Sequence, residues 1–179
     1  MKKIVIDARK SGTGTGRYVD KLIEYLAKSK SDFEYTVLTK AEQVKFIKSI
    51  APNFEVIETP YEDFSFGEQT GFKKQIESLK PDLVHFTMVQ QPVLYNGNVV
   101  TTMHDLTTCR FKNPAKNPIV FTIKQQVYKW VNKKAARKSE VVIVPSEFVK
   151  NDVADYARIN PEKIKVTYEA ADKITEAAR

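Results

Sequence analysis

The sequence contains very little cysteine and histidine. Cys109 is the only cysteine among 179 residues, which excludes an internal disulfide and fits a reducing compartment such as the cytosol. The two histidines, His85 and His104, are too few for a zinc cage unless carboxylates supply most ligands, so we expect no metal site. No apolar run approaches the roughly 20 residues that span a bilayer. Because Lys2-Lys3 lead directly into an apolar segment, we also expect no cleavable signal peptide.

Acidic residues are outnumbered by basic ones. The chain has 29 Lys and Arg against 22 Asp and Glu, a formal net charge of +7. Nucleic acid, an anionic membrane surface and phosphorylated substrates are the partners that such a charge suits. The lysines are mostly scattered, as on a solvated surface, with one denser run from Lys124 to Lys138. Since no recognition motif or aromatic-basic platform accompanies the charge, we do not expect nucleic acid as a partner.

Glycine is scarce as well, yet three of the six glycines lie in one short turn, at Gly12, Gly14 and Gly16. The apolar run 4–6 before the turn predicts a buried strand. The helical spacing after it predicts a helix with one apolar face, formed by Val19, Leu22, Ile23 and Leu26. A strand, a glycine turn and a helix in this order direct backbone N–H groups and the positive end of a helix dipole at one point. Such a point suits an anion, most often a phosphate.

This turn departs from both familiar phosphate-binding motifs. Val19 occupies the position of the third glycine in a dinucleotide fingerprint, and the second strand ends at Thr39-Lys40 without the expected acidic residue. A P-loop would require Gly-Lys-Ser/Thr where this chain has Gly16-Arg17-Tyr18. A turn that only makes a tight connection is therefore an equal alternative at this point.

Strand and helix patterns alternate along the rest of the chain. Strands are predicted over 34–39, 54–58, 83–86, 99–103, 141–144 and 164–168, and helices over 41–50, 71–79, 118–138 and 147–157, with a loop over 61–70. We find no repeat, low-complexity segment or linker. The pattern predicts a single α/β domain over 1–179, Rossmann-like, with a mostly parallel sheet and helices on both faces.

The predicted helix 118–138 combines apolar residues with many lysines. We expect its apolar face to pack on the sheet, because a helix between two parallel strands must cover it. This face contains Val120, Ile123, Val127, Trp130 and Val131. The lysines would then give weak, salt-sensitive contact with an anionic membrane, without insertion of the helix.

Ligands of parallel α/β sheets bind at the C-terminal ends of the strands. The Gly14 turn follows the first strand, His85 ends the fourth, and His104-Asp105 follow the fifth. We therefore favour a functional role for His104. For His85 a structural role is equally supported, because a satisfied histidine is common at a strand end.

Taken together, these segments resemble the N-terminal domain of a GT-B glycosyltransferase of the large retaining family four. No single motif is specific, but their order and spacing are. The matching stretches are Ile6-Asp7-Ala8-Arg9 with Gly14-Thr15-Gly16-Arg17-Tyr18, then Pro81-Asp82-Leu83-Val84-His85, His104-Asp105-Leu106, Val144-Pro145-Ser146-Glu147-Phe148, and the tail Pro161-Glu162-Lys163-Ile164-Lys165-Val166 followed by Glu169-Ala170-Ala171-Asp172.

The resemblance implies transfer of a sugar, as by a hexosyltransferase, from a nucleotide-sugar donor with retention at the anomeric carbon. The reaction would occur between two Rossmann-like domains, the first binding a glycan or lipid-linked acceptor and the second the nucleotide. Because the chain stops at Arg179, where the donor-binding domain should begin, we expect this domain alone to be inactive. We expect a cytoplasmic protein, with peripheral contact at the inner membrane face left open.

The resemblance also suggests roles for individual residues. The amides of Gly14, Thr15 and Gly16 would face the donor diphosphate, and Arg17 would add a phosphate contact. His104 would contact the transferred sugar, with His85 as a further substrate-binding candidate; Asp105 either orients the imidazole or caps a helix. No metal or cofactor is implied, since the usual Asp-x-Asp motif is absent. The alternatives are a dinucleotide-binding oxidoreductase domain, a nucleic-acid-binding module and a non-catalytic interaction domain.

Overall fold

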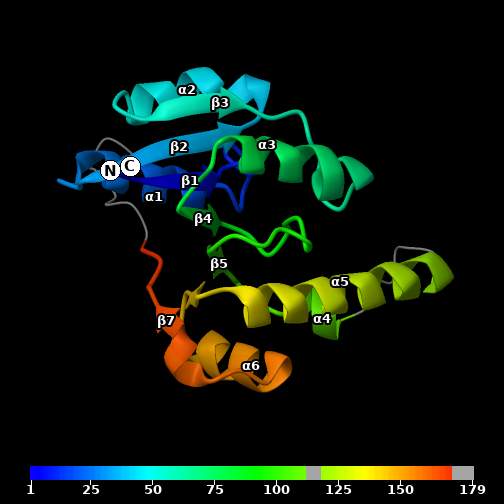
Figure 1. Cartoon of the computed structure of the whole chain (residues 1–179). Helices are drawn as coiled ribbons and strands as arrows, with labels where there is room; N and C mark the ends of the chain where they lie inside the picture. The colour runs from blue at the N-terminus through cyan, green and yellow to red at the C-terminus, as the bar shows by residue number, and fades with distance from the viewer. Residues whose placement is uncertain (112–117, 171–179) are drawn as a thin grey trace, which may run out of the picture.

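The computed structural model describes residues 1–111 and 118–170, with side chains omitted for 118–121. Seven parallel strands form one sheet in the order β3-β2-β1-β4-β5-β6-β7 (Figure 1). The strands are β1 Lys2–Asp7, β2 Phe33–Thr39, β3 Glu55–Glu58, β4 Leu83–Phe86, β5 Val99–Thr102, β6 Val141–Val144 and β7 Ile164–Val166. The predicted Rossmann-like α/β fold with a parallel sheet is thus confirmed.

Helices cover both faces of the sheet because successive strand residues point to opposite sides. In β1, Ile6 packs with α1 and α2, whereas Val5 packs with the α3 side. The third buried cluster joins β6 to α5 and α6. The helices are α1 Arg17–Lys28, α2 Val44–Ile50, α3 Lys73–Ser78, α4 Thr107–Arg110, α5 Pro118–Lys138 and α6 Glu147–Ala157. Short helical turns are η1 Ala41–Gln43, the π-helical η2 Glu68–Phe72 and η3 Pro161–Lys163.

Several elements differ from the sequence prediction in their bounds, and one element was not predicted. The stretch predicted as a loop over 61–70 already becomes helical at Phe66, and the Glu68 amide donates to Ser65 Oγ at 3.0 Å. The four-residue α4 was not predicted, and β7 ends at Val166 rather than at 168. The differences in bounds lie at element ends, which hydrophobic periodicity defines least well.

The orientation of α5 contradicts the prediction. Val131 is buried, but Ile123, Val127 and Trp130 are 63%, 52% and 51% exposed. The side chain of Val120, also assigned to the packed face, lies outside those described. Besides Val131, the face of α5 that packs inward is made mainly of small or polar residues: Gln125, Asn132, Ala135 and Ala136. The small side chains let the helix approach its neighbours closely, so this face packs inward and the face with Ile123, Val127 and Trp130 stays exposed.

The chain reverses its winding direction between β1 and β4, which are neighbours at the centre of the sheet. In open parallel sheets the crevice at such a switch point, at the C-terminal strand ends, is the usual ligand site. Thr87, just after β4, ties the two strand ends together by donating to the Asp7 carbonyl at 2.6 Å. None of the helices in the described residues is both long and apolar enough to cross a membrane.

Candidate functional site

The turn between β1 and α1 uses its glycines for different purposes. A Cβ on Gly16 would lie 1.9 Å from the Lys10 carbonyl oxygen, so this position requires glycine. The Gly16 amide is already used, donating to Thr13 O at 2.9 Å and to Thr13 Oγ1 at 3.1 Å. Gly14 has open space around its missing Cβ. Gly12 adopts a φ of +76°, which glycine accepts without strain. Gly14 is therefore the glycine that leaves room for a ligand, while Gly12 and Gly16 shape the turn.

The N-terminus of α1 opens toward the same space. No side chain caps the helix at Gly16. Asp20, in the first helical turn, instead holds the loop by accepting from Ser11 Oγ at 2.6 Å and from the Gly12 amide at 3.4 Å. The positive end of the helix dipole, together with Arg17, thus gives this end of the turn an electropositive character suited to an anion.

A cleft of about 580 Å³ lies beside this turn. One side is formed by α1 and its preceding turn, and the other by His104, β6 and the tail after β7. Its lining residues are Gly14, Thr15, Arg17, Tyr18, Lys21, Leu22, Tyr25, His104, Ile143, Thr167, Tyr168, Glu169 and Ala170. The Arg17 guanidinium crosses the cleft and donates to the Ala170 carbonyl at 3.2 Å. Four predicted site residues therefore share one cleft: Gly14, Thr15, Arg17 and His104.

His104 is held from three directions at the edge of the cleft. Its Nδ1 donates to Glu169 Oε1 at 2.8 Å, and its Nε2 lies 3.3 Å from the Thr87 carbonyl. The ring of Tyr18 contacts the imidazole edge to face, with centroids 4.9 Å apart. Both hydrogen-bond partners are acceptors, so a neutral imidazole serves only one of them at a time. The shorter contact to Glu169 orients the ring. Nε2 is then the nitrogen that can give up its 3.3 Å contact with the Thr87 carbonyl and bind a ligand instead.

His85 does not line the cleft. Its side chain is buried on the α1 side of the sheet, where Nε2 lies 2.9 Å from Thr102 Oγ1. The same hydroxyl lies 3.1 Å from the Tyr18 phenol oxygen. Burial lowers the pKa of His85 to about 4, and burial raises the pKa of Tyr18, so both side chains are neutral near pH 7. His85 therefore helps to position Tyr18 through the Thr102 hydroxyl, which lies within hydrogen-bonding distance of both side chains.

Asp105 caps a helix and does not orient the imidazole. Its exposed carboxylate accepts from the Thr107 amide at 2.6 Å, at the start of α4. The carboxylate that orients His104 belongs to Glu169. The sequence analysis included Glu169 in a matching stretch but predicted no role for it. Within the described residues, no group of three or more His, Cys, Asp or Glu side chains could hold a metal ion.

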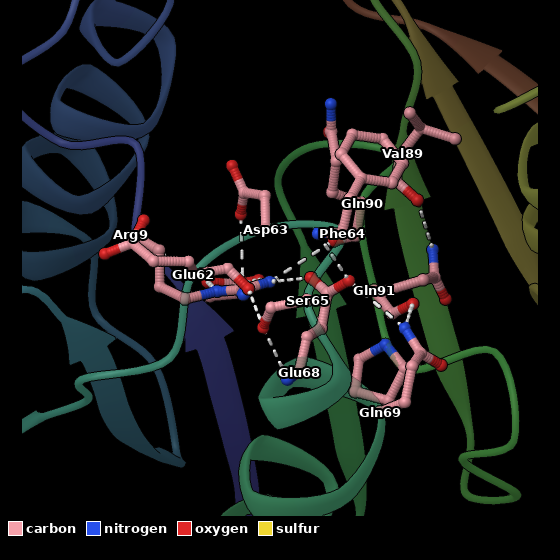
Figure 2. Close-up of polar contacts among 12 residues, drawn as sticks. Arg9, Glu62, Asp63, Phe64, Ser65, Glu68, Gln69, Val89, Gln90 and Gln91 are labelled. Atoms are coloured by element: carbon pink, nitrogen blue, oxygen red, sulfur yellow. Dashed lines mark hydrogen bonds and ion pairs between the residues drawn. The ribbon is translucent and has the colours of Figure 1, made fainter. Parts of the chain in front are cut away.

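A second charged cluster lies at the end of β1, around the buried guanidinium of Arg9 (Figure 2). Arg9 Nη2 donates to Asp7 at 2.8 Å and to Glu68 at 2.9 Å, and Nη1 lies 3.4 Å from Asp63. The guanidinium also stacks 3.9 Å above the centroid of Phe72. Burial disfavours the charged form of Arg9, but its carboxylate neighbours together outweigh this and raise its pKa.

This cluster fastens η2 to the end of β1. Glu68 is buried, and its second oxygen accepts from the Phe64 amide at 3.1 Å. Burial raises the pKa of Glu68 despite the cation beside it. Phe64, held with a φ of +54°, in turn packs its ring 5.6 Å from that of Tyr128 on α5. The charged groups are engaged with one another, so the cluster positions the segment after β3 relative to α5.

The comparisons with known proteins identify the family. The profile of Glycosyltransferase Family 4 matches residues 12–173, nearly the whole chain. The chain therefore belongs to this family, which confirms the resemblance stated from the sequence. No curated protein matches the chain.

Solved structures show the same fold at low sequence identity. A glycosyltransferase from Rickettsia africae superposes with a TM-score of 0.61 at 16% identity, covering 96% of this chain and 44% of that protein. The lipopolysaccharide outer core galactosyltransferase WaaB gives 0.56 at 14%, covering 96% and 46%. A protein assigned as a UDP-N-acetylglucosamine 2-epimerase from Listeria monocytogenes gives 0.61 at 14%, covering 92% and 44%. The chain thus spans less than half the length of each. Because an epimerase shares the fold with transferases, the family match is what favours glycosyl transfer.

Proposed function

We propose that this chain is the acceptor-side domain of a retaining hexosyltransferase that works in the cytoplasm. The complete enzyme moves a sugar from a nucleotide-sugar donor to a glycan or lipid-linked acceptor. The bond from the anomeric carbon to the diphosphate breaks, the bond to an acceptor oxygen forms, and the acceptor proton leaves with the nucleoside diphosphate. A donor-binding domain opposite the cleft completes the site, and without it this chain is inactive.

The observation that carries this proposal is the pairing of His104 with the uncapped N-terminus of α1 across one cleft. The leaving diphosphate gains negative charge during transfer, and preorganised N–H dipoles stabilise such charge best. The imidazole is oriented by Glu169 and lines the same cleft, so in this proposal it contacts the sugar attached to that diphosphate. Glycosyl transfer requires an anion site for the leaving diphosphate and an oriented hydrogen-bonding side chain for the sugar.

The roles of the turn residues follow from their contacts. Gly14 and Thr15 line the cleft and present backbone to the donor phosphates, and Arg17 adds positive charge. Gly16 contributes by closing the turn, because its amide already bonds Thr13. His85 contributes through Tyr18 rather than by touching substrate.

Donor binding by the chain alone is the first test. With half of the site missing, UDP- and GDP-sugars should bind with a Kd above about 1 mM, less than about 4 kcal/mol of binding free energy. Isothermal titration with a panel of such sugars measures this. Micromolar binding of any of them would place the complete donor site within these 179 residues and contradict the proposal.

The second test is turnover in a protein that joins this chain to its donor-binding domain. His104→Ala should lower kcat by about 100-fold or more, as for loss of a preorganised transition-state contact, with little change in the unfolding midpoint. Asp105→Ala is the matched control, since Asp105 is the next residue but its carboxylate only caps α4. Near-normal turnover of His104→Ala, or equal losses in both variants, would remove His104 from the catalytic site.

A further inference from the structure

The side chain of Tyr18 contacts both His104 and the sheet, and the proposed function gives it no role of its own. Tyr18 belongs to the first turn of α1, directly after the glycine turn, and lines the cleft. The centroid of its ring lies 4.9 Å from that of the His104 imidazole, and the two planes are 81° apart. Its phenol oxygen lies 3.1 Å from Thr102 Oγ1 on β5. Tyr18 thus connects the imidazole in the cleft with a strand of the sheet.

The phenol end of Tyr18 is anchored among buried groups. Thr102 is 1% exposed, and its Oγ1 also lies 2.9 Å from Nε2 of His85 on β4. A neutral phenol, a hydroxyl and a neutral imidazole can each donate one hydrogen bond and accept one, so all three groups are satisfied in a single chain. Such chains are strong where water is excluded. Tyr18 is therefore tied to two neighbouring strands.

The other two contacts of His104 are less suited to hold the ring in place. The carboxylate of Glu169 is 47% exposed and lies on the tail after β7. An exposed ionic contact of this kind contributes little stability. The contact of Nε2 with the Thr87 carbonyl is the one that a ligand would replace. Of these three supports, Tyr18 combines a half-buried ring, a place on a helix and an anchor in the sheet, and a ligand leaves it intact.

We propose that Tyr18 is a positioning residue for His104. Its ring fixes the plane of the imidazole, because edge-to-face contact favours a defined angle between the two rings. The hydrogen-bond chain through Thr102 and His85 fixes Tyr18 in turn. Glu169 then keeps the proton on Nδ1, and Tyr18 keeps Nε2 where a ligand can replace the Thr87 carbonyl. The effect on turnover rests on the proposed function, whereas the state of the imidazole can be measured in this chain alone.

Nuclear magnetic resonance of the imidazole nitrogens is the first test. The sequence has only two histidines, so the signals that disappear in His104→Gln belong to His104. At about pH 9, where an ordinary imidazole is neutral, His104 should show a protonated Nδ1 and an unprotonated Nε2. Tyr18→Leu keeps an apolar side chain but removes the ring. It should populate both tautomers, so that the two nitrogen signals move toward each other. Unchanged signals in this variant would overturn the proposal.

Two milder variants test the anchor and keep the ring of Tyr18. Tyr18→Phe and Thr102→Val each remove one hydroxyl of the chain, so both should move the His104 signals in the same direction as Tyr18→Leu but less far. Wild-type signals in both would overturn the role of the chain. Tyr25→Leu is the matched control, because it makes the same substitution about two turns later on α1 beside the same cleft. It should leave the His104 signals unchanged. Circular dichroism checks that each variant is folded.

Turnover in the protein joined to its donor-binding domain is the second test. Tyr18→Leu should lower kcat between about 10- and 100-fold with little change in KM for the donor, because a displaced group still permits binding but slows the reaction. In a His104→Ala background the same change should have no further effect, since Tyr18 acts through the imidazole. A further loss of similar size there would mean that Tyr18 meets the substrate itself and would overturn the proposal. If His104→Ala keeps normal turnover while Tyr18→Leu still mixes the nitrogen signals, the proposed function fails and the positioning role stands.

Discussion

The buried position of His85 predicts that the folded state loses stability when the solution is acidified. Its imidazole is nearly inaccessible and shares the Thr102 hydroxyl with Tyr18. Burial disfavours the charged imidazolium and lowers the pKa of His85 from 6.5 to about 4 in the folded chain. In the unfolded chain the same imidazole is hydrated and keeps an ordinary pKa near 6.5.

The sign and size of the effect follow from proton linkage. Between about pH 6.5 and pH 4 the unfolded state binds a proton that the folded state does not, so acid favours unfolding. The stability is fully present above pH 6.5 and declines as the pH falls toward the folded pKa of His85 at about 4. Each pH unit of difference between the two pKa values is worth about 1.4 kcal/mol. The total loss is therefore about 3 kcal/mol, a large share of the 5–15 kcal/mol typical of a domain.

His85→Gln isolates this contribution. The glutamine amide can still hydrogen-bond Thr102, but it does not titrate, and His104 is present in both proteins. Urea unfolding of each protein, followed by far-UV circular dichroism between about pH 7.5 and pH 4.5, gives the two stability profiles. We expect the wild-type profile to fall more steeply, by up to about 1.4 kcal/mol per pH unit. Parallel profiles would show that His85 binds its proton equally in the folded and unfolded states and would refute its burial as a neutral group.

Two further predictions concern the turn and the charged cluster. Arg9→Met should lower the free energy of unfolding by about 3–5 kcal/mol in urea titrations, because it leaves the carboxylates of Asp7 and Glu68 buried without their cation; an unchanged free energy would contradict a structural role for the cluster. Gly16→Ala should lower the melting temperature strongly, since the new Cβ would overlap the Lys10 carbonyl oxygen. Gly14→Ala faces open space and should change the free energy of unfolding by no more than about 0.5 kcal/mol. Equal losses of stability in the two variants would refute the distinction between these glycines.

The fold was predictable because its signals are local. Hydrophobic patterning alone indicates several of the elements, among them the strands Lys2–Asp7 and Val141–Val144 and the helix Arg17–Lys28. The parallel sheet then follows from the alternation of strand and helix. The orientation of α5 was not predictable in this way, because two of its faces carry side chains able to pack on the sheet. Ala135 and Ala136 are weakly hydrophobic and gave little signal, yet they form part of the close contact with the core.

The candidate site was predictable only as far as strand ends reveal it. The rule that ligands bind at C-terminal strand ends correctly brought Gly14 and His104 to one cleft. It could not supply Glu169, because the contact joins residues 65 positions apart and depends on the path of the tail after β7. Nor could it find the role of Arg9, because its partners Asp63 and Glu68 lie on a segment without a clear periodic pattern.

The two histidines illustrate why proximity to a strand end is not enough. His85 is still paired within the sheet, opposite Val100 of β5, so its side chain must point to one face and is covered there by Tyr18 and Thr102. His104 lies two residues beyond Thr102, the last residue of β5, where the alternation of the sheet no longer dictates direction. Its imidazole can therefore turn into the cleft and be held there by a residue from another segment, Glu169. A histidine within the paired part of a strand is held against one face of the sheet and stabilises the fold. A histidine beyond the last paired residue can turn toward a ligand, even where the apolar run continues past that residue.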